Sequence, residues 1–176
     1  MYQGVIMSGF GGQGIISAGI LLAYSGMVDG KYVTFFPAYG AEMRGGTANC
    51  SVVVSTEEVA SPVVSSPDSL IVMNEPSLLK FEPALKANGL LLINHSLVSS
   101  KPKRGDVNAV TIDANKIAEE IGTVRCANMV MLGVLINHTR AVSLESMIKT
   151  LPKVFPRAKK EMLQMNEDAL KKGATF

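Results

Sequence analysis

The first candidate site is a glycine-rich segment near the start of the chain. Residues 9–14 read Gly-Phe-Gly-Gly-Gln-Gly and match the pattern G-x-G-x-x-G. Glycine lets the backbone turn tightly and approach a phosphate, and the first turn of a following helix offers N–H groups that lack acceptors. The alternative is a tight strand-to-helix turn whose glycines serve only close packing. The candidate binding residues are Gly9, Gly11, Gly12, Gln13 and Gly14.

A second unusual segment, residues 39–47, places a glutamate and an arginine among glycines. It reads Tyr-Gly-Ala-Glu-Met-Arg-Gly-Gly-Thr. A guanidinium can bind a carboxylate or a phosphate through two parallel hydrogen bonds, and glycines beside it permit close approach of the backbone. The spacing equally allows a surface hairpin loop with a weak ion pair. The candidate binding residues are Glu42, Arg44, Gly45, Gly46 and Thr47.

Other residues that could perform chemistry are few. The chain holds two cysteines and two histidines, and it contains no Cys-x-x-Cys pair. A structural zinc site or an iron–sulfur cluster needs more ligands than Cys50 and Cys126 can supply. His95 and His138 lie far apart and suggest no Ser-His-Asp arrangement. We therefore predict no metal ligand and no catalytic residue on this chain, and we expect both thiols to be reduced and buried.

The elements around the glycine segment follow from the hydrophobic pattern. Tyr2–Ser8 is a short apolar strand, and Ile15–Met27 repeats apolar residues at helical spacing. Tyr32–Phe36 is β-branched and aromatic, which favours a second strand. A strand, a helix and a strand within about 35 residues predict parallel pairing of the two strands. Thr47–Ser55 is a further strand that follows soon afterwards, so we expect a mixed sheet.

The rest of the chain continues this alternation and then becomes helical. Ser143 and Asp113 are candidate caps for two of the helices. We predict a single domain over residues 1–176, with a three-layer α/β/α fold, a Rossmann-like start and a mixed, mainly parallel sheet. The expected strands are Leu70–Asn74, Leu90–Asn94 and Ala109–Asp113, and the expected helices are Glu75–Lys86, Asn115–Ile121, Asn128–Asn137, Leu144–Thr150 and Arg157–Lys171.

Composition excludes several classes of protein. Hydrophobic residues make up 47% of the 176 residues and charged residues only 18%, a balance that excludes general disorder. The net charge of +2 is too close to neutral to suggest nucleic-acid binding. The longest apolar runs fall short of a membrane span, and the N-terminus shows no secretory signal, so we expect a cytoplasmic location.

A nicotinamide cofactor fits the sequence poorly. Dinucleotide-binding domains carry an acidic residue near the end of their second strand, where it holds the ribose. The corresponding strand here runs into Phe35, Phe36 and Pro37, and Asp29 lies before the strand instead. A free-standing nucleotide-binding dehydrogenase domain nevertheless remains an alternative on the glycine segment alone.

Four segments in a fixed order carry a resemblance to a known family. They are the glycine segment, residues 39–48 with the sequence Tyr-Gly-Ala-Glu-Met-Arg-Gly-Gly-Thr-Ala, the pair Ser61-Pro62, and residues 73–77 with the sequence Met-Asn-Glu-Pro-Ser. Together they resemble the gamma subunit of 2-oxoacid:ferredoxin oxidoreductases. The resemblance is strong from Tyr2 to Ser96 and looser beyond.

The resemblance implies a role in a larger complex. Such complexes oxidatively decarboxylate a 2-oxoacid to its acyl-coenzyme A thioester and pass the electrons through iron–sulfur clusters to ferredoxin. Thiamine diphosphate, Mg²⁺ and the clusters would belong to alpha and beta subunits and to a ferredoxin-like delta subunit. This chain would serve assembly, with both glycine-containing segments at a shared surface near coenzyme A. On its own it would be inactive and could form a homodimer.

The substrate is expected to depend on the partner subunits. The short separate chain and the sequence Tyr-Gly-Ala-Glu-Met-Arg favour 2-oxoglutarate as the substrate. Branched-chain 2-oxoacids such as 2-ketoisovalerate are the second candidate. A purely structural scaffold that binds partner chains and no small molecule is the other alternative.

Overall fold

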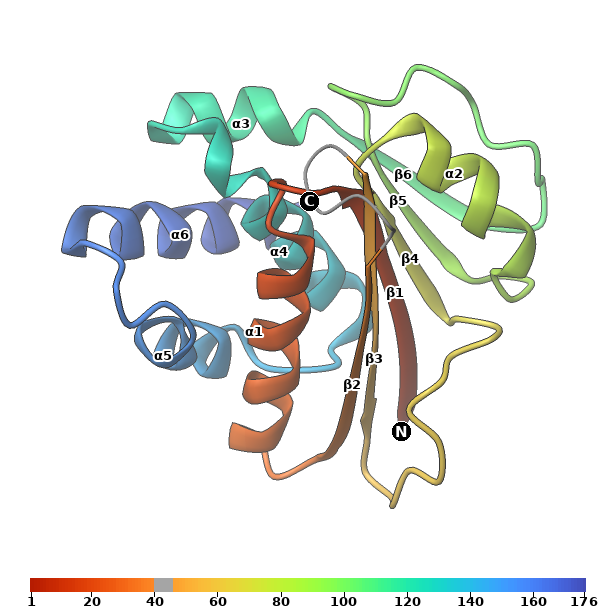
Figure 1. The fold of residues 1–176 in the computed structure, drawn as a ribbon, viewed down its shortest axis with the longest axis horizontal. Coiled ribbons are helices and arrows are strands. Elements are labelled where there is room, and N and C mark those ends of the chain that lie inside the picture. Colours follow the sequence, from red (N-terminus) through yellow and green to blue (C-terminus); the bar gives the residue numbers. More distant parts are fainter. Residues whose placement is uncertain (40–45) are drawn as a thin grey trace.

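The described residues, 1–39 and 46–176 of a computed structural model, form one six-stranded sheet with helices on both faces (Figure 1). Along the sheet the strands follow the order β2-β3-β1-β4-β5-β6. Strand β1 lies near the middle, so the glycine segment that follows it emerges from the centre of the sheet edge. The strands are β1 (Tyr2–Phe10), β2 (Tyr32–Tyr39), β3 (Thr47–Ser55), β4 (Ser69–Val72), β5 (Leu90–Asn94) and β6 (Asn108–Ile112).

The sheet is mixed and mainly parallel, which confirms the predicted fold class. β1, β4, β5 and β6 pair in parallel, whereas β3 is antiparallel to both β1 and β2. The prediction that the first two strands pair directly was wrong, because β3 lies between them. A short connection between consecutive strands favours antiparallel pairing, so β3 folds back along β2 and its other edge then pairs with β1.

Helices cover the two faces of the sheet unequally, and this completes the three layers. The short helix α2 (Glu75–Phe81) and the 3₁₀ turn η1 (Glu82–Ala84) cover one face, and the longer helices lie on the other (Figure 1). Alternation along each strand supplies two cores: Val5 and Met7 of β1 belong to the larger, and Ile6 between them to the smaller. The helices of the larger face are α1 (Ile15–Val28), α3 (Ala114–Ile121), α4 (Ala127–Thr139), α5 (Leu144–Val154) and α6 (Lys160–Gly173), with the 3₁₀ turn η2 (Val124–Cys126) before α4.

Helix α4 is the central element of the larger core. Its predicted apolar residues Met129, Met131, Leu132, Leu135 and Ile136 are all at most 3% exposed, which confirms the expectation of a buried helix. A helix that is apolar all round must be covered on all sides. Here β5 lies against α4, and so do α1, α3 and α6.

Some local boundaries differ from those predicted. β1 continues through Gly9 and Phe10, and β2 continues through Pro37, which a strand at the edge of a sheet tolerates because one side of it makes no ladder hydrogen bonds. Ser143 caps α5 by accepting a hydrogen bond from the N–H of Ser146 at 3.1 Å, as predicted, whereas Asp113 makes no such bond at α3.

In the described part of the chain, no helix is long and apolar enough to cross a membrane.

The carboxylate of Asp29 joins the end of α1 to the start of α5. It accepts hydrogen bonds from the N–H of Ser143 at 2.7 Å and from the Ser143 hydroxyl at 3.0 Å, and another from the Ser146 hydroxyl. Burial opposes ionisation, but the bonds from Ser146 and Ser143 and the charge of Lys31 outweigh it. Together they hold the pKa of Asp29 below its ordinary value.

We expect Asp29→Asn to lower stability at neutral pH and to matter less in acid. An amide oxygen cannot replace a carboxylate that accepts from three donors, and the loss should be about 1–2 kcal/mol. Because the folded-state pKa of Asp29 is depressed, its contribution is present above the unfolded pKa of about 3.9 and disappears as the pH falls through the folded value. Urea unfolding at pH 7 and pH 3 checks this, with Asp113→Asn as the control. An equal difference from wild type at both pH values would contradict the prediction.

Candidate functional site

The glycine segment turns the chain from β1 into α1 at the edge of the sheet. Gly12 and Gly14 have φ angles of 99° and 72°, a region that side-chain-bearing residues rarely adopt. Gly14 is the residue before α1, and its carbonyl accepts hydrogen bonds from the N–H of Ala18 at 2.9 Å and from the side chain of Asn128 at 3.0 Å. The turn therefore requires glycine at these two positions, and the first turn of α1 points its N–H groups out of the sheet edge.

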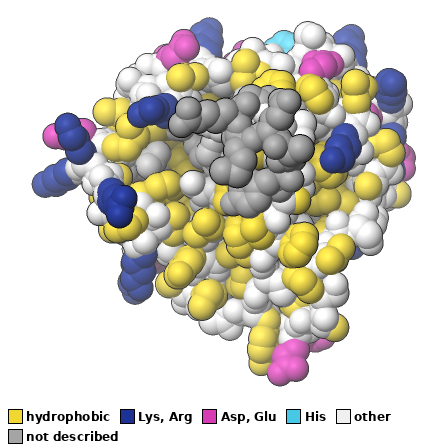
Figure 2. Space-filling model, in the orientation of Figure 1, with side chains coloured by type: hydrophobic (Ala, Val, Ile, Leu, Met, Phe, Trp, Pro, Cys, Tyr) yellow, Lys and Arg dark blue, Asp and Glu magenta, His cyan; other side chains and the backbone are white. Residues whose placement is uncertain are grey.

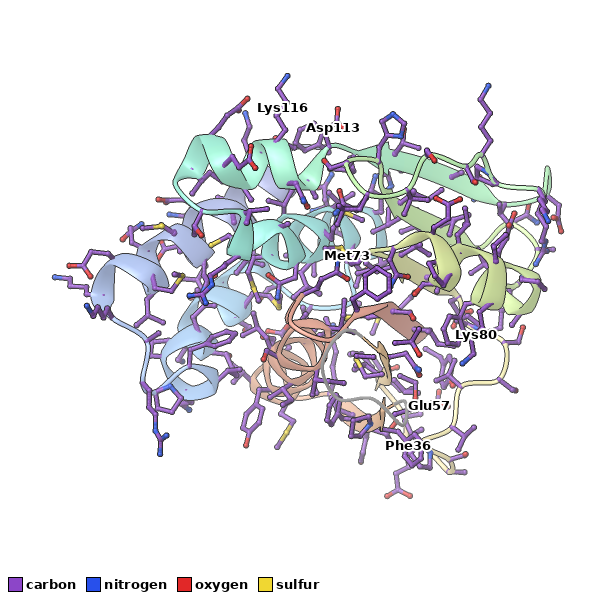
Figure 3. All side chains as sticks on the ribbon, turned by 45° about the horizontal axis from the view of Figure 1, so that its top comes forward. Phe36, Glu57, Met73, Lys80, Asp113 and Lys116 are labelled. Atoms are coloured by element: carbon purple, nitrogen blue, oxygen red, sulfur yellow. The ribbon has the colours of Figure 1, made fainter. Side chains whose placement is uncertain are left out.

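This edge is a switch point of the sheet. Neighbouring strands β1 and β4 are followed by helices on opposite faces, α1 on one and α2 on the other (Figure 1). In open α/β sheets, ligands bind outside the carboxyl ends of the parallel strands at such a point. Figure 3 turns this edge toward the viewer and shows Met73, which follows β4, in its middle.

The structure brings residues 73–77 against the glycine segment. The N–H of Met73 donates to the carbonyl of Ser8, the residue directly before the glycine segment, at 2.8 Å, and the hydroxyls of Ser8 and Ser77 lie 2.7 Å apart. Asn74 caps α2 by accepting a hydrogen bond from the N–H of Ser77 at 3.0 Å. Two of the segments that carried the family resemblance are therefore one structural unit at the edge of the sheet.

The second predicted segment connects β2 to β3, and its end reaches the same place. The N–H of Gly11 donates to the carbonyl of Gly46 at 2.9 Å, and Thr47 pairs with Phe10 in the sheet. Gly46 and Thr47 are thus beside the glycine segment, as the hypothesis of a shared site requires. Glu42, Arg44 and Gly45 lie outside the described residues.

Two cavities flank the glycine segment. One of about 140 Å³ is lined by Gly12, Gln13 and Met73 on one side and by η2 and the start of α4 on the other. The second, of about 290 Å³, lies between the start of α1 and helices α4 and α6, with Gly12, Gly14 and Ser17 on its α1 side. Gly12 borders both cavities, so a ligand seated in either would contact the turn.

Sequence reasoning missed Arg125, which lines both cavities. Among the described residues that line them, it is the one charged side chain, and it is exposed. A guanidinium beside helix N–H groups makes an electropositive setting suited to phosphate. No local pattern around Arg125 could have revealed this, because η2 reaches the glycine segment only through the packing of α4 against α1 and the sheet.

Gln13 makes contacts that the sequence did not suggest. Both polar atoms of its side chain bond to the protein backbone, one to the N–H of Phe10 and one to the carbonyl of Met73. Gly12 and Gly14 remain candidate binding residues through their backbone groups. The side-chain amide of Gln13 already bonds to the protein backbone with both of its polar atoms.

Two buried asparagines lie at the carboxyl ends of the neighbouring strands β4 and β5: Asn74 comes shortly after β4, and Asn94 is the last residue of β5. Asn74 and Asn94 are 1% and 0% exposed, yet Nδ2 of Asn74 and Oδ1 of Asn94 find no hydrogen-bond partner among the described residues. The other amide atom of Asn94 donates to Asn115 at 2.9 Å, and Asn115 lines the smaller cavity. Unpaired buried polar atoms are uncommon in folded proteins.

The thiols are buried, as predicted. Cys50 and Cys126 are both free and 0% exposed. Burial raises the pKa of Cys50 to about 12, and it also raises the pKa of Cys126. A thiol of raised pKa and no exposure is a poor nucleophile at neutral pH. Among the described residues, no group of three or more His, Cys, Asp or Glu side chains is arranged to hold a metal ion.

The geometry disfavours a dinucleotide site of the usual kind. β3 separates β2 from β1, so the strand that would present an acid to the ribose is not a neighbour of the glycine segment. Asp29 precedes β2 and is bonded to Ser143 and Ser146 near the start of α5.

Comparison with known proteins agrees with this geometry. Residues 4–176 match the pyruvate ferredoxin/flavodoxin oxidoreductase family. The ketoisovalerate oxidoreductase subunit VorA of Methanothermobacter thermautotrophicus is 38% identical over 172 residues, covering 98% of this chain and 36% of VorA. The 2-oxoglutarate synthase subunit KorC of Methanocaldococcus jannaschii is 38% identical over 164 residues, covering 92% of this chain and 88% of KorC. The chain thus spans about a third of VorA and most of KorC.

Two solved structures share the fold over almost the whole chain. The gamma subunit of a keto/oxoacid ferredoxin oxidoreductase from Geobacter sulfurreducens is 29% identical, with a TM-score of 0.82 over 97% of this chain and 95% of that subunit. A 2-oxoglutarate:ferredoxin oxidoreductase from Magnetococcus marinus, with 2-oxoglutarate, coenzyme A and succinyl-CoA bound, is 26% identical, with a TM-score of 0.89 over 99% of this chain and 30% of that one. With this sheet order, the joined motifs and a match over nearly its full length, the chain belongs to the pyruvate ferredoxin/flavodoxin oxidoreductase family.

Proposed function

We propose that this chain is the gamma subunit of a 2-oxoacid:ferredoxin oxidoreductase. The observation that carries the proposal is its match, over 97% of its own length and 95% of the other chain, to a separate gamma subunit. The complex would oxidatively decarboxylate a 2-oxoacid to its acyl-coenzyme A thioester and reduce ferredoxin. Iron–sulfur clusters are assigned to partner subunits, because the two buried cysteines of this chain cannot ligate a cluster. Thiamine diphosphate and Mg²⁺ are assigned to the partner subunits as well.

The chain would contribute a surface for assembly and for coenzyme A. Figure 2 shows hydrophobic side chains gathered over the lower half of the molecule. Among the described residues, α1 and β2 also expose large apolar side chains. Exposed apolar surface of this kind marks protein interfaces. These residues are Tyr24, Met27, Val28, Tyr32 and Phe36, each between 39% and 62% exposed.

Coenzyme A suits the edge of the sheet by its charge. Its phosphates require cationic groups and N–H donors, which Arg125 and the turn around Gly12 and Gly14 supply beside the two cavities. Ser17 adds a hydroxyl at the start of α1. We include Glu42, Arg44 and Gly45 in the same site, since Gly46 at the end of their segment is bonded to Gly11. Bound coenzyme A supplies the thiol that accepts the acyl group.

We propose 2-oxoglutarate as the substrate of the complex, with 2-ketoisovalerate as the second candidate. Relatives with both specificities are 38% identical to this chain, so identity alone does not separate them. The sequence Tyr-Gly-Ala-Glu-Met-Arg at residues 39–44 is the feature of the chain that favours the first.

Reconstitution tests the proposal. We expect the purified chain to be inactive with a 2-oxoacid, coenzyme A and a viologen dye, because no side chain replaces thiamine diphosphate as an electron sink. A tagged chain purified from its native cells should bring alpha and beta subunits with it. This complex should reduce the dye in a reaction that depends on coenzyme A, fastest with 2-oxoglutarate in a panel that includes 2-ketoisovalerate and pyruvate.

Several outcomes would contradict the proposal. Turnover by the isolated chain, or full activity of a complex that never contained it, would each overturn the assignment. Calorimetry with NAD and with coenzyme A separates the alternatives. Tight NAD binding by the chain would favour a free-standing dehydrogenase domain, and assembly without any effect on coenzyme A use would favour a scaffold.

A further inference from the structure

The side chain of Gln13 fastens the glycine segment at two points. Its Oε1 accepts a hydrogen bond from the N–H of Phe10 at 2.6 Å, and its Nε2 donates to the carbonyl of Met73 at 3.0 Å. Its own N–H donates to the carbonyl of Phe10 at 3.2 Å. The two bonds between Gln13 and Phe10 hold the turn in its folded shape. The bond to Met73 joins the turn to the end of β4, across the switch point.

The absence of a side chain at Gly9 is explained by this contact. A Cβ at Gly9 would lie 2.3 Å from Oε1 of Gln13 and 2.8 Å from Cβ of Met73. Gly9, Gln13 and Met73 are therefore packed as one unit, and Gln13 and Met73 continue from it into the wall of the 140 Å³ cavity. Moving the Gln13 side chain would release both the turn and this wall.

We propose that Gln13 is a positioning residue that sets the shape of the coenzyme A-facing turn and makes no contact with the ligand through its amide group. The inference rests on the proposed function of this edge as a coenzyme A site. An amide is needed because one end of the side chain must accept from Phe10 while the other donates to Met73. A carboxylate cannot donate, and a lysine or arginine cannot accept.

Gln13→Glu is the sharpest variant, because it keeps the size of the side chain and the acceptor for Phe10. It removes the donor to Met73 and places a carboxylate oxygen against the carbonyl oxygen. In the reconstituted complex, we expect the KM for coenzyme A to rise about tenfold, with calorimetry on the same complex giving a matching rise in Kd. The KM for the 2-oxoacid and kcat at saturating coenzyme A should stay within about twofold of wild type. Gln13→Ala, which removes both contacts, should raise the coenzyme A KM at least as much.

Gln3→Glu is the matched control. Gln3 lies at the other end of β1 and likewise donates through Nε2, to the hydroxyl of Ser69 at 2.7 Å. The same substitution there loses one donor and adds one charge, far from the turn. Gln3→Glu should lower the Tm by about as much as Gln13→Glu does and leave every kinetic constant unchanged.

The outcomes separate this inference from the proposed function. The inference is overturned if the wild-type complex shows coenzyme A-dependent dye reduction but the Gln13 variants lower only the Tm. It is also overturned if they lower kcat/KM for coenzyme A and kcat/KM for the 2-oxoacid by the same factor, because Gln13 is then merely structural. If wild-type chain supports no such activity, the proposed function itself fails. A selective rise in the coenzyme A KM with both Gln13 variants, absent in Gln3→Glu, supports the positioning role.

Discussion

Replacing Gly133 by alanine should cost the protein at least about 3 kcal/mol of stability. A Cβ at this position would lie 2.3 Å from the carbonyl oxygen of Leu170, 2.8 Å from the N of Ala174 and 2.8 Å from the Cα of Gly173. All three are backbone atoms of α6 or of the residue after it, so no side-chain rotation can relieve the overlap. Helix α6 would have to move away from α4.

The loss is large because this crossing closes the larger core. Gly173 meets α4 just as closely, since a Cβ there would lie 2.0 Å from the carbonyl oxygen of Val130. Separating the helices would loosen the cover of α6 over residues such as Val130 and Leu170, both 0% exposed. For a chain of this length, about 3 kcal/mol corresponds to a fall in Tm of roughly 6–12 °C.

Urea unfolding and thermal melting of Gly133→Ala check this result. Gly105→Ala is the control, because no heavy atom lies within 4 Å of a Cβ built there. The control should change stability by no more than about 0.5 kcal/mol. If Gly133→Ala is insoluble while Gly105→Ala is not, the prediction holds in its strongest form. A Gly133→Ala protein as stable as wild type would show that the helices do not cross as closely as described.

The largest expected functional effect concerns Arg125. Removing its charge with Arg125→Gln should raise the KM for coenzyme A in the reconstituted complex by roughly 10- to 100-fold and leave the KM for the 2-oxoacid unchanged. The physical basis is a charge-assisted hydrogen bond to phosphate, worth about 1.5–3 kcal/mol. Arg125 is the one charged side chain among the described residues lining the two cavities beside Gly12, so no described neighbour there can take over its role.

Arg140→Gln is the matched control for Arg125→Gln. Arg125 precedes α4 and Arg140 follows it, and both arginines are exposed, so the two variants change the same charge at opposite ends of one helix. Only the first should alter coenzyme A use. The difference between wild type and Arg125→Gln should shrink as salt is raised, because the interaction is electrostatic and partly exposed. Equal KM values for both variants and wild type at low salt would remove Arg125 from the site.

Helices, strands, caps and motifs that depend on residues close together in the chain could be predicted from the sequence. The strand, glycine turn and helix over residues 2–28 follow from hydrophobic period and glycine spacing, and the structure has them within two residues of the predicted limits. Buried α4 followed from its continuous apolar residues, and the cap at Ser143 from its residue type. The family followed from short motifs in order, because each motif is a contiguous run of residues.

The strand order and the surroundings of the glycine turn depend on contacts between residues far apart in the chain, so the sequence did not reveal them. The position of β3 between β1 and β2 depends on how a hairpin pairs with a third strand, which no local pattern records. Arg125 lines the same cavities as Gly12, and Gln13 bonds to Met73, only after α4 and β4 have packed around the sheet edge. Gly133 and Gly173 look like ordinary helical glycines until the two helices cross. The sequence by itself therefore determined the elements, the motifs and the family, because these depend on neighbouring residues. The tertiary structure alone decided which side chains surround the glycine turn and which glycines are indispensable, because those depend on the packing of segments far apart in the chain.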